Sequence, residues 1–177
     1  MSTQTSLSPT TGVTLQVHRL APLAIGALRI FIGWSFFWAF IDKLFGLSYA
    51  TPSENAWIRG GSPTKGFLSN TEGPLSGLWS SIAGAGWANW GFMLGLLALG
   101  VAMLLGITNR LATIGGTAMF MLMWSVVLPP VTNPILDDHW IQGAAILVLG
   151  ALGAHRYYGL GNWWDNLPIV QRFPILK

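Results

Sequence analysis

The sequence lacks cysteine entirely and contains little charge of either sign. Its 177 residues include no Cys, nine Lys or Arg and six Asp or Glu, so charged residues make up only 8% of the chain. Without cysteine there is no disulfide, no cysteine-ligated iron–sulfur cluster and no thiolate zinc site. The formal net charge of +3 is too small and too scattered to predict binding to nucleic acid.

Apolar residues dominate the rest of the composition. They account for 52% of the chain and form long runs separated by polar stretches. This composition is typical of an all-α integral membrane protein with one membrane-embedded domain, so the lipid bilayer is an expected partner. The polar N-terminus, MSTQTSLSPTTG, lacks the basic start of a signal peptide, and we expect the first apolar run to be retained.

The apolar runs predict four helices packed as an antiparallel four-helix transmembrane bundle. In the long polar loop after the first run, Leu75, Leu78, Trp79 and Ile82 recur at helical spacing, which predicts a short amphipathic helix. The predicted organisation is an N-terminal tail at 1–19, a transmembrane domain at 20–158 with spans at about 22–47, 87–107, 111–128 and 140–155, and an amphipathic C-terminal tail at 159–177.

The first span carries charges that are unusual within an apolar run. Arg29 and Asp42 are about 20 Å apart along a helix, whereas the hydrocarbon core of a bilayer is about 30 Å thick. At least one of the two charges is therefore expected to face the inside of the bundle. Arg29 shares one stripe with Gly26, Gly33 and Lys43, and this stripe is predicted to face the other helices.

Basic residues are distributed unevenly between the two predicted ends of the bundle. The end that holds both termini carries five of them with one acid, whereas the other end carries three with five acids. By the positive-inside rule, both termini are cytoplasmic in a multi-pass protein of the plasma membrane, and the long loop faces outward. The basic residues of the cytoplasmic end are Arg19, Arg110, Arg156, Arg172 and Lys177, and those of the outer end are Lys43, Arg59 and Lys65.

Four segments resemble proteins of the DoxX family, most closely its DoxD-type branch. They are LRIFIGWSFFWAFIDKLFGL, AWIRGGSPTKGFL, TNPILDDH and YYGLGNWWDNLPIVQRFPIL, within a resemblance that extends over about residues 20–177. The resemblance implies a membrane subunit of a thiosulfate:quinone oxidoreductase, with quinone as diffusible electron acceptor and another membrane or membrane-attached subunit as partner. Positions that match relatives are Arg29, Gly33, Lys43, Gly61, Ser62, Pro63, Gly66, Asn133, Asp138 and His139.

Asp138 and His139, at the start of the fourth span, are the candidate catalytic residues. Histidine and aspartate are suited to exchange protons between outer water and a bound quinone near neutral pH. The alternative interpretation is a helix cap whose acids interact favourably with the helix dipole. The two interpretations are compatible.

Arg59, Lys65 and Gly61 are candidate substrate-binding residues in the outer loop. Two cations and glycine-exposed backbone N–H groups would hold a small oxyanion such as thiosulfate, although solvated loop charges give the same pattern. Lys43 is a further candidate because it shares the inward face of the first span. Arg29 would hold an acidic partner, a lipid headgroup or a ligand carbonyl, or would instead extend to the cytoplasmic surface.

Most tryptophans fall toward the outer half of the predicted bundle. An aromatic belt at the membrane interface explains most of them, and a subset would also stack on a quinone ring. No haem is expected, because His139 lies at the opposite end from His18 and His155, and no metal site is expected.

The sequence leaves functions of different classes open. As an oxidoreductase subunit, the chain would pass electrons from a small sulfur anion to quinone directly or through a partner. As a non-catalytic accessory or assembly subunit of a respiratory membrane complex, it would use its small-residue faces and amphipathic tail as contacts. A channel or carrier is less favoured, because no span is visibly broken by Gly or Pro at mid-membrane.

Overall fold

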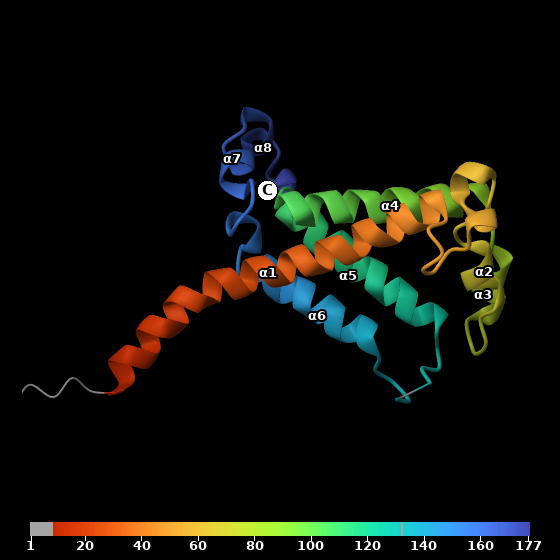
Figure 1. Cartoon of the computed structure of the whole chain (residues 1–177), viewed down its shortest axis with the longest axis horizontal. Helices are drawn as coiled ribbons and strands as arrows, with labels where there is room; N and C mark the ends of the chain where they lie inside the picture. Colours follow the sequence, from red (N-terminus) through yellow and green to blue (C-terminus); the bar gives the residue numbers. More distant parts are fainter. Residues whose placement is uncertain (1–8, 132) are drawn as a thin grey trace, which may run out of the picture.

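The computed structural model describes the backbone of residues 9–131 and 133–177 and the side chains of residues 20–131 and 133–177. All secondary structure in this described part is helical, which confirms the all-α prediction. Long helices run through the middle of the molecule, and short helices gather at both ends (Figure 1). The long helices are α1 (Pro9–Phe45), α4 (Gly86–Leu105), α5 (Asn109–Val126) and α6 (Asp138–Ala151).

The long helices pack mainly as two pairs, α1 with α4 and α5 with α6. Two glycines bring α1 and α4 together. A Cβ atom at Gly33 would lie 2.9 Å from the backbone nitrogen of Leu104, and one at Gly100 would lie 2.7 Å from that of Phe37. Glycine at such a contact lets two helix backbones approach closely.

One apolar core joins the two pairs. Phe36 of α1 and Phe120 of α5 are buried with their ring centroids 4.9 Å apart. Met93 and Leu96 of α4 and Ile146 of α6 are buried in the same cluster. All four long helices therefore contribute side chains to a single core.

The loop between α1 and α4 folds over one end of the bundle, which we call the loop end. Its helix α3 (Ser76–Ser81) lies where the short amphipathic helix was predicted. The segment between α5 and α6 reaches the same end (Figure 1). The other short helices of this end are η1 (Ser53–Asn55), η2 (Trp57–Arg59) and α2 (Lys65–Ser69).

The residues after α6 fold against the opposite end, which we call the tail end. The backbone N–H of Arg110 donates to the carbonyl of Lys177 at 2.7 Å, and its Nη1 donates to that of Pro174 at 3.0 Å. These bonds attach the C-terminus to the start of α5. The short helices of the tail end are η3 (Ala154–Arg156), α7 (Gly161–Asp165), α8 (Pro168–Arg172) and η4 (Pro174–Leu176).

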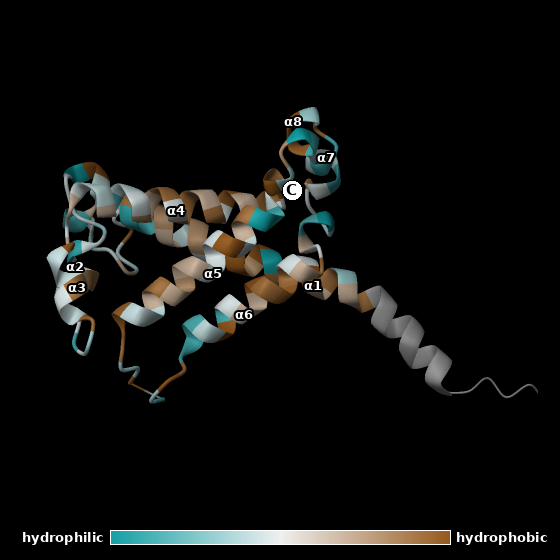
Figure 2. Ribbon diagram, turned by 180° about the vertical axis from the view of Figure 1, so that it is seen from behind, coloured by the Kyte–Doolittle hydropathy of each residue, from teal (hydrophilic) through white to brown (hydrophobic). Residues whose placement is uncertain are grey.

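Two helical segments are long and apolar enough to cross a membrane, namely Leu20–Phe45 within α1 and Gly86–Leu105. Apolar residues run along the middle of the long helices, and polar residues gather toward the two ends (Figure 2). Helices α5 and α6 are shorter, with 18 and 14 residues. Helix α6 ends at Ala151 rather than near residue 155, because Gly153 has a φ of 64° and begins a 3-10 turn.

Helix α1 begins before the first predicted span. The helix begins at Pro9 rather than near residue 22, so the N-terminal tail predicted at 1–19 is helical over part of its length. No Gly or Pro interrupts residues 13–21, and Pro22 is accommodated inside the helix. Residues 1–8 of the predicted tail lie outside the described part.

Candidate functional site

A pocket of about 630 Å³ opens at the loop end, and we call it the lysine pocket. Lys43 near the end of α1 and Lys65 at the start of α2 both line it. Phe92 of α4 and Met123 of α5 form an apolar part of its wall. The pocket therefore brings together α1, the loop between α1 and α4, and two further long helices.

Asp42 shapes the side of the pocket that lies next to Lys43. Its carboxylate is 1% exposed and accepts hydrogen bonds from the backbone N–H groups of Tyr49 at 3.3 Å and Ala50 at 3.0 Å. The chain turns back through Gly46, whose φ is 65° and whose N–H donates to the carbonyl of Asp42 at 2.8 Å. Asp42 thus ends α1 and directs the loop along the pocket, a role that sequence reasoning missed.

Asn89 holds the other side of the pocket. Its side-chain oxygen accepts hydrogen bonds from the hydroxyl of Ser62 at 3.0 Å and from the hydroxyl and backbone N–H of Thr64 at 2.7 and 3.2 Å. Its amide nitrogen donates to the carbonyl of Gly84 at 3.3 Å. These bonds attach the segment before Lys65 to α4. The only sequence signal for this role was one asparagine in the first turn of an apolar helix.

The lysine pocket is positively charged and contains hydrogen-bonding side chains. No acidic residue lines it, and within the described part of the chain neither Lys43 nor Lys65 forms an ion pair. Thr51, Ser62 and Ser69 add hydroxyl groups to its lining. Ammonium groups and hydroxyls are donors suited to the oxygens of a small anion.

A second, almost wholly apolar pocket of about 220 Å³ adjoins the lysine pocket. Phe67, Phe92 and Met123 line both pockets. Trp79 and Trp87 add aromatic surface to the second pocket. The two pockets therefore share an apolar wall, with cations on one side of it and aromatic surface on the other.

Arg59 and Gly61 are not among the residues that line the lysine pocket. The Arg59 side chain is exposed and donates from Nη1 to the hydroxyl of Ser53 at 2.7 Å. The N–H of Gly61 donates to the carbonyl of Ala56 at 3.0 Å, and a Cβ atom at Gly61 would collide with the backbone of Asn55. Gly61 thus permits a tight turn, while of the two predicted loop cations only Lys65 reaches the pocket.

His139 pairs with Asp137 rather than with Asp138. Asp137 is the N-cap of α6, with Oδ1 accepting from the backbone N–H of His139 at 3.1 Å and Oδ2 lying 2.6 Å from its Nδ1. Asp138, the other candidate catalytic residue, is exposed, and the N-cap expected as an alternative is provided by Asp137. The His139 ring lies 6.1 Å from that of Phe120 and is not part of the lysine pocket.

Arg29 lies at the tail end, and its hydrogen bonds to the described residues all go to backbone carbonyls. It is 3% exposed; its Nη1 donates to the carbonyls of Met103 and Leu104, and its Nη2 donates to those of Tyr157 at 3.1 Å and Tyr158 at 3.0 Å. The negative end of the α4 dipole supports the charge. Arg29 therefore faces inward, as its position on the stripe with Gly26 and Gly33 predicted. Through its hydrogen-bond partners it connects α1 to α4 and to the tail end.

A second group of charges at the tail end was not predicted. His155 is buried, and its Nε2 lies 3.1 Å from Oδ2 of Asp165, which also accepts from Nη2 of Arg156 at 2.9 Å. Burial alone would raise the pKa of Asp165, but hydrogen bonds from His155 and Arg156 and the charge of Arg156 outweigh it and hold that pKa below its ordinary value. This cluster fixes α7 against η3.

Comparison with known proteins gives no relative, since no family model, curated protein or solved structure matches this chain. Among the residues that the structure describes, no three His, Asp or Glu side chains are grouped so as to hold a metal ion. The function is therefore argued from the two adjoining pockets.

Proposed function

We propose that the four long helices form a transmembrane bundle in the plasma membrane, with both termini cytoplasmic and the loop end outside. The two membrane-length segments support this proposal, as does the charge difference between the ends. Helix α6 would span only about 21 Å, which requires local thinning of the bilayer. Large apolar side chains exposed on the four helices include Leu28, Phe31, Trp87, Leu94, Ile114, Leu122, Ile141 and Leu147.

The protein then binds a small sulfur oxyanion such as thiosulfate and serves as the membrane subunit of a quinone-linked oxidoreductase, as its resemblance to DoxD-type proteins implies. The observation that carries this proposal is the shared position of Lys43 and Lys65 in one pocket without an acidic residue. Two ammonium groups in a pocket whose lining contains no acidic residue attract an anion and provide up to six N–H donors.

The adjoining apolar pocket is the place we assign to the quinone ring. Its aromatic and methionine lining suits a flat ring, and ligand sites are commonly apolar with a few polar groups at one side. Two thiosulfate ions would each give up one electron and join through a new S–S bond. The quinone would take both electrons with two protons to become quinol. His139, which is held by Asp137 and lines neither pocket, is the group we assign to proton supply from the solvent.

Steady-state turnover of the purified protein with thiosulfate and a soluble quinone tests this function. We expect Lys43→Ala and Lys65→Ala to raise the KM for thiosulfate, most strongly at low salt, and to change kcat less. Arg59→Ala removes the same charge from the same end outside the pocket, so it is the matched control and should leave KM unchanged.

Two results would contradict the proposal. If Arg59→Ala raises KM as much as the lysine variants do, a general surface field attracts the anion and the pocket has no special role. If the protein shows no turnover and co-purifies stoichiometrically with a respiratory oxidase, it is an accessory subunit.

A further inference from the structure

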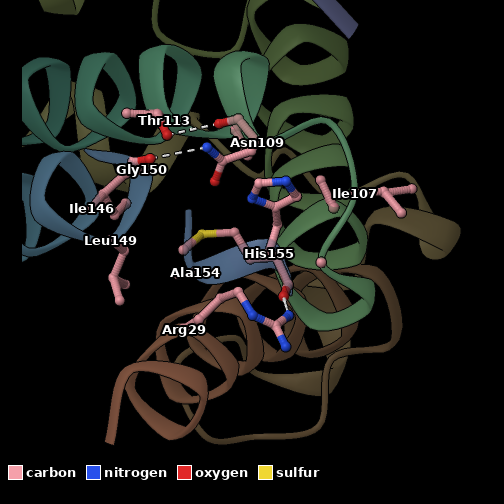
Figure 3. Close-up of a pocket in the computed structure, with 13 residues that line it drawn as sticks. Arg29, Ile107, Asn109, Thr113, Ile146, Leu149, Gly150, Ala154 and His155 are labelled. Carbon is pink, nitrogen blue, oxygen red and sulfur yellow. Dashed lines mark hydrogen bonds between the residues drawn. The ribbon is translucent and has the colours of Figure 1, made fainter. Parts of the chain in front are cut away.

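A small buried cavity lies at the tail end, far from the lysine pocket. Its volume is about 20 Å³, and its polar lining comes from Arg29, Asn109, Thr113 and His155 (Figure 3). A water molecule needs roughly 10–15 Å³ on this measure, so the cavity has room for one. The other lining residues are apolar or glycine and come from α4, α5, α6 and the turns that follow α4 and α6.

Two side chains that line this cavity each have a buried nitrogen without a hydrogen-bond partner among the residues that the structure describes. These nitrogens are Nε of Arg29 and Nδ1 of His155, in residues that are 3% and 6% exposed. The other nitrogens of both side chains are engaged, by four backbone carbonyls for Arg29 and by Asp165 for His155. Buried polar atoms are nearly always hydrogen-bonded, so a partner is expected for each.

The proton positions define what that partner must be. Nε2 of His155 faces a carboxylate oxygen of Asp165 at 3.1 Å, so in the neutral ring Nε2 carries the proton and Nδ1 is an acceptor. Nε of Arg29 is always a donor. The amide nitrogen of Asn109 donates to the carbonyl of Gly150 at 3.1 Å, which leaves its oxygen as another acceptor.

We propose that the cavity is a binding site for one resident water molecule. The water accepts a hydrogen bond from Nε of Arg29 and donates to Nδ1 of His155, with its second hydrogen available to the side-chain oxygen of Asn109. A monatomic anion fits less well, because it would face the lone pair of Nδ1. The water completes a chain from Asp165 through His155 to Arg29 and fixes His155 as the Nε2–H tautomer. This inference does not depend on the proposed function.

Crystals of the full chain grown with bromide as the halide test the site directly. We expect density for one water within hydrogen-bonding distance of Nε of Arg29 and Nδ1 of His155, and no anomalous bromide peak. A bromide peak would identify an anion site instead, and an empty cavity would mean that both atoms stay unpaired. Either result overturns the proposal.

Replacement of Ala112, which is buried and lines the cavity, provides a test in solution. Ala112→Val fills the water position with methyl groups, so it should lower Tm and shift the His155 Nδ1 resonance in ¹⁵N spectra toward that of a free acceptor. Ala112→Ser supplies a hydroxyl in place of the water, so it should change Tm and the His155 Nδ1 resonance less than Ala112→Val does. Ala118→Val, at an exposed position of the same helix, controls for helix propensity. A higher Tm with an unchanged His155 resonance in Ala112→Val would indicate a dry cavity and overturn the proposal.

Discussion

Asp42, Asn89 and Arg29 are buried polar side chains that bind mainly backbone atoms from distant parts of the chain. Asp42 turns the loop after α1, Asn89 attaches the same loop to α4, and Arg29 joins α1 to α4 and the tail end. A buried polar side chain of this kind stabilises one arrangement, because any other arrangement leaves several groups unpaired. Two of the three, Asp42 and Asn89, adjoin the proposed site.

At the residue scale, Asn89→Ala tests how the loop between α1 and α4 is attached to α4. The variant leaves Ser62, Thr64 and the Gly84 carbonyl without their partner, so we expect the free energy of unfolding to fall by about 1–3 kcal/mol. The KM for thiosulfate should rise as well, because Lys65 loses its fixed position. Thermal unfolding and turnover measure the two effects.

Asn70→Ala is the matched control for that variant. Asn70 is exposed in the same loop and donates only to the carbonyl of Gly66 at 2.8 Å. It should change stability little. Equal losses in Asn89→Ala and Asn70→Ala would show that Asn89 has no special role.

Asp165→Asn tests the charge cluster of the tail end. The folded state lowers the pKa of Asp165, so the ionised carboxylate stabilises the folded protein. This stabilisation is fully present above the unfolded pKa of about 3.9 and is lost as the pH falls through the lower pKa of the folded state. The variant should therefore have a lower Tm than the parent at pH 7, and the difference should shrink below about pH 4. A difference that stays constant between pH 7 and pH 3 would contradict this assignment.

At the scale of helices, the apolar runs predicted which segments form the bundle, but the contacts between those segments could not be predicted. The stripe of Gly26, Gly33 and Arg29 correctly indicated the inner face of α1. The close contact on α4 is made by Gly100, whereas Gly91 of the same helix is exposed. Several small residues in one helix give several possible faces, and the partner helix selects among them.

A pair of glycine variants tests that selection. Gly100→Ala places a Cβ atom within 2.8 Å of backbone atoms of Phe37, which cannot move without separating α1 from α4. We expect a loss of about 1–3 kcal/mol in stability, as for other overpacked positions. Gly91→Ala meets no atom within 4 Å and should be neutral or stabilising through helix propensity. Unfolding of both variants in detergent makes the comparison, and a more stable Gly100→Ala would contradict the packing.

For the whole molecule, the sequence predicted that the long loop and the Asp-Asp-His segment lie at one end, and both reach the loop end in the structure (Figure 1). Lys43 and Lys65 meet there, but Arg59 and His139 lie outside the lysine pocket. The meeting of Lys43 and Lys65 in one pocket depends on hydrogen bonds that Asp42 and Asn89 form with backbone and loop groups. Such long-range contacts leave no periodic pattern in a sequence, which is why the site was predicted only in part.

The absence of cysteine makes the proposed membrane orientation simple to measure. Ser53→Cys at the loop end should react with a membrane-impermeant maleimide in intact cells, whereas Gln171→Cys at the tail end should react only after the cells are opened. The reverse pattern would invert the orientation. Labelling of both positions in intact cells would place both ends outside.

The most direct test of the central claim is calorimetric titration of the purified protein with thiosulfate at low salt. Because a hydrogen bond to a charged group is worth about 1.5–3 kcal/mol, Lys43→Ala and Lys65→Ala should each weaken the affinity by about tenfold or more. The Arg59→Ala control should bind like the parent. Equal affinities for the parent and both lysine variants would contradict an anion site in the lysine pocket.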